Sequence, residues 1–100
     1  MEIVFLYSRL LSISRHQLDA LRRNDFDEME RLTMDRELLT AQICSVLDNA
    51  EVDLDDTRFQ IRISELTDNI SEVDEDIKDI LLSELFQRTE ELSRIKLVED

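Results

Sequence analysis

The sequence has no glycine and no proline, and it has a single cysteine in 100 residues. Average usage would place about seven glycines and five prolines in a chain of this length. Glycine-rich phosphate loops and dinucleotide-binding fingerprints require glycine where the backbone approaches the phosphate, so both are excluded. Tight β-hairpins also favour glycine, which argues against a multi-stranded antiparallel sheet. These absences leave a small all-α protein of long helices and few loops as the expected fold.

The residues that usually carry chemistry are equally scarce. Cys44 alone can form neither an intrachain disulfide nor a thiolate zinc cluster, and we expect a small packed residue there. His16 is the only histidine and has Ile13 three residues before it, so the Glu-x-x-His motif of carboxylate-bridged metal sites is missing. The acidic clusters at 53–56 and 72–76 lack the central glycine of a calcium-binding EF-hand loop. We therefore expect no metal, no cofactor and no enzymatic activity.

The charge is strongly acidic, with 25 acidic and 12 basic residues and a formal net charge of −13. Such a surface repels phosphate, which disfavours nucleic acid and anionic membranes as partners and favours a basic protein surface. The longest apolar run, residues 3–7, is far shorter than the roughly 20 residues of a membrane helix. Glu2 stands where a signal peptide would carry a basic residue. We expect a cytoplasmic protein with one domain over residues 1–100.

Hydrophobic periodicity predicts helices over residues 2–23, 25–48, 57–72 and 74–98. Asn24 suits the left-handed position that ends a helix, and Asp25 suits the cap of the next one. Asn49 repeats this signal before an expected loop that lasts to Asp56, which is placed to start the third helix. The expected architecture is an antiparallel helical bundle of three to four helices with coiled-coil-like packing.

The joint near residues 71–75 is the least clearly marked one. An apolar seam approaches it through Phe59, Ile63, Leu66, Ile70 and Val73, and the later apolar positions slip by about one residue. One helix over 57–98 would be about 63 Å long, against about 33–36 Å for the first two helices. Because such a helix would leave half of its seam uncovered, we expect a bend or break at 71–75. The alternative is an unbroken helix, which would require a dimer partner.

Several residues do not fit a simple core. Arg36 and Arg88 each interrupt an apolar stripe, and an arginine there must either extend to solvent, which we favour, or meet a carboxylate within the chain or on a partner. Apolar residues off the seams suggest a groove for a partner helix, although a wider four-helix core is the alternative. The candidate partner-binding residues are Arg36, Leu38, Leu47, Ile61, Leu82, Leu85 and Phe86.

Four stretches of the chain form a further pattern. The first helix reads Leu10-Leu11-x-x-Ser14 and continues with Leu18 and Leu21, and the break after it carries Asp25-Phe26-Asp27. The next helix reads Met29-x-x-Leu32-x-x-x-Arg36-x-x-Leu39, and an acidic segment follows later as Val73-Asp74-Glu75-Asp76-Ile77. From Leu10 to about Ile95 the chain thereby resembles the small flagellar export chaperones of the FliT and FlgN type.

The resemblance implies a cytoplasmic chaperone for a filament-cap or hook–filament junction subunit. Such a chaperone binds the amphipathic C-terminal helices of the subunit, prevents premature assembly and hands the subunit to the type III export apparatus. The resemblance also implies export ATPase components or a transcriptional regulator as further partners, and an autoinhibitory last helix. A dimeric coiled-coil structural subunit and a non-flagellar type III secretion co-chaperone are the alternatives, so a monomer and a homodimer both remain open.

Overall fold

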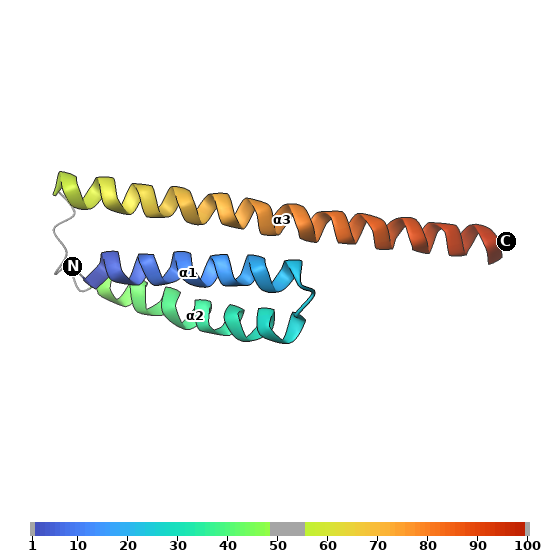
Figure 1. The fold of residues 1–100 in the computed structure, drawn as a ribbon, viewed down its shortest axis with the longest axis horizontal. Coiled ribbons are helices and arrows are strands. Elements are labelled where there is room, and N and C mark those ends of the chain that lie inside the picture. The colour runs from blue at the N-terminus through green and yellow to red at the C-terminus, as the bar shows by residue number, and fades with distance from the viewer. Residues whose placement is uncertain (1, 49–55, 100) are drawn as a thin grey trace.

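The computed structural model describes residues 2–48 and 56–99, with side chains as far as residue 87. Three helices follow one another in the chain: α1 (Glu2–Arg22), α2 (Phe26–Asp48) and α3 (Thr57–Glu99). Figure 1 shows α1 and α2 as an antiparallel hairpin, with α3 alongside it and running well past the turn. The described residues contain no strand. The prediction of an all-α fold of packed helices is therefore confirmed, and of the three to four helices expected, the described residues contain three.

The turn between α1 and α2 has the predicted residues in the predicted roles. Asn24 adopts a left-handed conformation with a φ of 58°. Its N–H donates to the carbonyl of Leu21 at 3.1 Å, and the N–H of Asp25 donates to the carbonyl of Ala20 at 2.9 Å. These two bonds make the Schellman motif, which satisfies the last carbonyls of α1. The Asp25 carboxylate then accepts the N–H of Glu28 at 3.2 Å and caps α2.

The start of α3 is capped in a similar way. The Asp56 carboxylate accepts the N–H of Arg58 at 2.9 Å, which confirms the expected role of Asp56. Asn49 and the expected loop over residues 49–55 lie outside the described residues.

Helix α1 is the central element of the bundle. It packs against both α2 and α3, whereas no described Cα atom of α2 comes within 8 Å of one of α3. Two small side chains on α1, Ser14 and Ala20, are completely buried, which permits this close packing. The main apolar cluster draws on all three helices and consists of Ile3, Leu6, Leu10, Leu11, Leu39, Ile43, Phe59, Leu66 and Ile70.

Helix α3 is continuous through residues 71–75, so the predicted break there is wrong. The segment expected as a separate helix over 74–98 is the second half of α3. Ile70 and Ile77 are both buried, and because they lie seven residues apart they face the same side of one helix. No glycine or proline interrupts the backbone, and Asp74, which lies in the expected break, pairs with Arg36 on α2. The molecule is accordingly elongated, with a longest extent of 64 Å.

The hairpin covers only the first half of α3. A second, smaller apolar cluster joins Leu18 and Leu21 of α1 to Ile77 of α3, with Ile80 packed against it. This cluster lies at the turn end of the hairpin, and the remainder of α3 extends beyond it (Figure 1). None of the described helices combines the length and the apolar character that crossing a membrane would require.

Candidate functional site

A network of four polar side chains connects all three helices. Both guanidinium Nη atoms of Arg36 on α2 donate to the two carboxylate oxygens of Asp74 on α3, each at 2.8 Å. The same Nη1 atom also donates to Oε1 of Gln17 on α1 at 3.0 Å. The amide nitrogen of Gln17 donates in turn to the hydroxyl of Thr33 on α2 at 3.1 Å. We call Gln17, Thr33, Arg36 and Asp74 the polar layer.

The polar layer lies between the buried residues of the two apolar clusters, and Val73 on α3 packs against both clusters. In α1, Gln17 is only 4% exposed and lies between Leu11 of the main cluster and Leu21 of the smaller one. A polar group this deeply buried requires hydrogen-bond partners, and the amide of Gln17 has one on each of its two polar atoms. The hydrogen bonds to Asp74 raise the pKa of Arg36 above its usual value, although partial burial opposes the change. Arg36 therefore stays charged at all ordinary pH values.

A groove of about 430 Å³ begins at the polar layer. Gln17, Arg36 and Asp74 form its polar end. Its lining is predominantly apolar and comes mainly from α3, with a contribution from α2: Met29, Ile77, Leu81, Leu82 and Leu85, together with Lys78. All three helices thus contribute to the groove, which lies between α2 and α3 where their backbones stay apart.

The apolar face of α3 changes direction along the groove. Ile63, Ile70 and Ile77 recur every seven residues and face the hairpin, but the next position in this series is Glu84. At 3.6 residues per turn, Leu81 and Leu82 lie about 40° and 140° around the helix from Ile77. Both are substantially exposed. Leu81 and Leu82 therefore present apolar surface that α1 and α2 leave largely uncovered.

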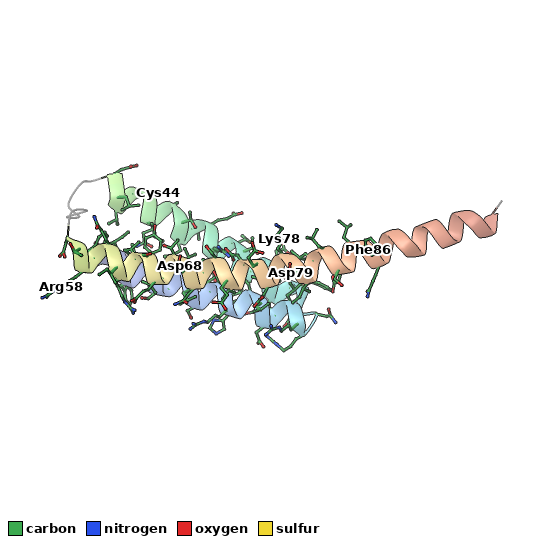
Figure 2. The ribbon with its side chains drawn as sticks, turned by 90° about the horizontal axis from the view of Figure 1, so that it is seen from above. Cys44, Arg58, Asp68, Lys78, Asp79 and Phe86 are labelled. Atoms are coloured by element: carbon green, nitrogen blue, oxygen red, sulfur yellow. The ribbon has the colours of Figure 1, made fainter. Side chains whose placement is uncertain are left out.

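The predicted partner-binding residues divide into three groups. Arg36, Leu82 and Leu85 line the groove together. Phe86 is 66% exposed and follows them on the free part of α3 (Figure 2). The structure thus brings three of the seven predicted residues together in the groove.

The other three predicted residues do not join this surface. Leu38, 73% exposed, lies in a separate depression between α1 and α2 with Arg9 and Ile13. Leu47, near the end of α2, and Ile61, near the start of α3, are exposed away from the groove. The side chain of Arg88 lies outside the described residues.

The expectation that the side chain of Arg36 extends to solvent is wrong. Its side chain does not extend freely to solvent, because it meets the carboxylate of Asp74 within the same chain. The sequence contains no local signal for the observed pair, which joins residues 38 positions apart.

Sequence patterns did not identify the other groove residues as a site. Met29 and Ile77 belong to the apolar seams, and Gln17 and Lys78 have no special spacing. Leu81 is the groove residue that the sequence could have revealed, because the apolar positions of α3 leave the seam at this residue.

The described residues contain no group of three or more histidine, cysteine, aspartate or glutamate side chains placed to hold a metal ion. Cys44, expected as a packed residue, is exposed on α2 (Figure 2). His16 is exposed, and its Nδ1 atom lies 2.7 Å from the carbonyl of Ser12. The chemistry of the site is therefore that of an apolar groove with a charged, hydrogen-bonded end.

No family model, curated protein or solved structure matches this chain.

Proposed function

We propose that the protein is a cytoplasmic flagellar export chaperone that binds an amphipathic helix of an export substrate. The observation that carries the proposal is the apolar groove between α2 and α3, together with its continuation onto the free half of α3. Apolar grooves of this kind accept the apolar face of a partner helix through anchors spaced three and four residues apart. The export context comes from the resemblance to the FliT and FlgN type of chaperone.

The client in this proposal is the C-terminal helical segment of a filament-cap or hook–filament junction subunit. Binding would cover apolar residues of the client that otherwise drive assembly. Export ATPase components and a transcriptional regulator are the further partners that the resemblance implies. The second half of α3 then supplies part of the binding surface, because it continues α3 and does not fold back over the groove.

A binding measurement with matched variants tests the proposal. The full chain is titrated with C-terminal segments of candidate cap and junction subunits, using isothermal titration calorimetry. Leu82→Ser, in the groove, should weaken binding about ten-fold, since burying a leucine contributes about 1.5–3 kcal/mol. Leu38→Ser, which removes an exposed leucine from the separate depression between α1 and α2, should leave the affinity unchanged. Failure of every candidate client to bind would contradict the proposal.

One observation favours a second function, a dimeric coiled-coil assembly subunit. Helix α3 is unbroken and extends past the hairpin, as the dimer alternative requires. Two copies could cover each other's free halves of α3. Sedimentation equilibrium over a wide range of concentrations distinguishes the two functions, since a folded monomer at all concentrations would exclude the obligate dimer.

A further inference from the structure

The arrangement of the three helices resembles three corners of a square. Helices in contact have axes about 8–10 Å apart, and in a triangular bundle each helix contacts both others. Here α1 contacts α2 and α3, but no described Cα atoms of α2 and α3 lie within 8 Å of each other. In a four-helix bundle, this is the relation between two helices on a diagonal. The side between α2 and α3, opposite α1, therefore has the shape of a position for a fourth helix.

The side chains that line this side indicate where a fourth helix would make apolar contacts. The polar layer forms one end of the groove on this side. There Arg36 on α2 bonds to Asp74 on α3 and to Gln17 on α1. From there toward the free end of α3, the lining is Met29, Ile77, Leu81, Leu82 and Leu85. A helix placed here would bury apolar side chains against the turn end of the bundle and the free half of α3.

Exposed acids that come next in the sequence to lining residues of the groove indicate the flanks of that helix. Glu37 follows Arg36 on α2, and Glu75 and Asp79 follow Asp74 and Lys78 on α3. All three acids are exposed, and none forms an ion pair with another described residue. Arg36 is already neutralised by Asp74, which leaves Lys78 as the one unpaired cation among the described lining residues.

The net charge distinguishes between the two sources of a fourth helix. A second copy of the chain would bring another formal charge of −13 against the first. Like charges across an interface oppose association, whereas complementary charges steer partners together. A helix from a different protein with basic flanks matches both the apolar lining and the acidic edges.

We propose that the side between α2 and α3 binds an amphipathic helix of a partner protein whose apolar face is flanked by lysine or arginine, completing a four-helix bundle. The inference rests on the proposed function in placing a partner helix in the groove, and it adds the chemistry of that helix. Lysine or arginine on one flank pairs with Glu75 and Asp79, and on the other flank with Glu37.

Synthetic peptides test the inference on the full chain. Three peptides of about 20 residues are compared by fluorescence anisotropy: one with a leucine-rich face flanked by lysine, one with the same face flanked by glutamate, and one with the composition of the first but no amphipathic order. The lysine-flanked peptide should bind at least about ten-fold more tightly than either of the others. A ten-fold difference corresponds to about 1.4 kcal/mol, which two or three exposed ion pairs can supply.

Two pairs of variants locate the site. Leu81→Ser with Leu82→Ser should weaken binding of the lysine-flanked peptide about ten-fold, while Leu38→Ser should not change it. Glu75→Gln with Asp79→Asn should weaken it several-fold and reduce its salt dependence. Glu2→Gln with Asp27→Asn removes the same charge away from the groove and should have a smaller effect. Circular dichroism confirms that each variant remains helical.

Several results would overturn the inference. If the glutamate-flanked peptide binds as tightly as the lysine-flanked one, the groove does not select basic flanks. If the peptide without amphipathic order binds equally tightly, binding depends on charge attraction alone and not on an apolar helix face. A dimer of the chain that Leu81→Ser with Leu82→Ser dissociates would assign the groove to a second copy. If the lysine-flanked peptide binds here but no export client does, the proposed function fails and the inference about the groove stands. If a client binds through acidic flanks, the inference fails and the function stands.

Discussion

Arg36 on α2 and Asp74 on α3 form a two-bond ion pair, at 2.8 Å for each bond, between helices whose backbones do not touch. Gln17 on α1 accepts a third hydrogen bond from the same guanidinium. A polar contact inside an apolar bundle can fix the register of its helices, because any other register leaves the groups unpaired. We infer that the polar layer sets the position of α3 along the hairpin, and hence the shape of the groove.

Removing one partner of this pair should destabilise the bundle. We expect Asp74→Asn to lower the free energy of unfolding by about 1–2 kcal/mol, between the values for exposed and for fully buried pairs. The intermediate value follows because the side chains are 26% and 40% exposed. Urea denaturation measures the change, and the exposed Asp68→Asn serves as the control. Equal effects of the two substitutions would show that the pair contributes nothing.

Ser14 tests how closely α1 packs against its neighbours. Its side chain is fully buried, and its hydroxyl donates to the carbonyl of Leu10 at 2.9 Å. Ser14→Ala should be nearly neutral, since this carbonyl also accepts the helical N–H of Ser14. Ser14→Leu should cost about 1–3 kcal/mol because a close-packed interior does not accept the extra volume. Thermal denaturation compares the two variants, and similar melting temperatures would indicate an unoccupied space beside Ser14.

The stability of the protein should depend on which residue occupies position 24, because Asn24 has a left-handed backbone conformation. Its φ of 58° suits glycine and asparagine but costs about 1–2 kcal/mol for other residues. Asn24→Ala should therefore lower stability by about 1 kcal/mol, while Asn24→Gly should be neutral or slightly stabilising. A chemical denaturation series measures both. A fully stable Asn24→Ala protein would mean that the turn has another conformation.

The ion pair of Glu28 and Arg31 gives a prediction about pH. Hydrogen bonds from Arg31 lower the pKa of the Glu28 carboxyl below its usual value. The pair therefore contributes to stability above the usual glutamate pKa, and the contribution is lost as the pH falls through the lowered folded-state pKa. A carbon-detected NMR titration should place the midpoint of Glu28 below that of an ordinary glutamate. In Arg31→Gln it should return to the ordinary range, and an unchanged midpoint would contradict the assignment.

The sequence predicted local features well and long-range ones poorly. Asn24, Asp25 and Asp56 act through bonds to residues within five positions, so their types alone revealed the helix ends. The length of α3 was mispredicted because a mismatch with the shorter helices outweighed the absence of any breaker near residue 73. The partner of Arg36 depends on how α3 is placed against α2, which no local pattern encodes.

The free half of α3 should be the least stable part of the fold. An isolated helix of about 15 residues is marginal in water because its nucleation is costly and few tertiary contacts repay it. Hydrogen exchange followed by mass spectrometry should show slow exchange over residues 59–77 and much faster exchange over residues 84–99. Adding a peptide that occupies the groove should slow exchange near Leu81 and Leu82, while Leu81→Ser with Leu82→Ser should reduce this protection at the same peptide concentration. Uniformly slow exchange along α3 in a dilute monomer would show that its second half needs no partner.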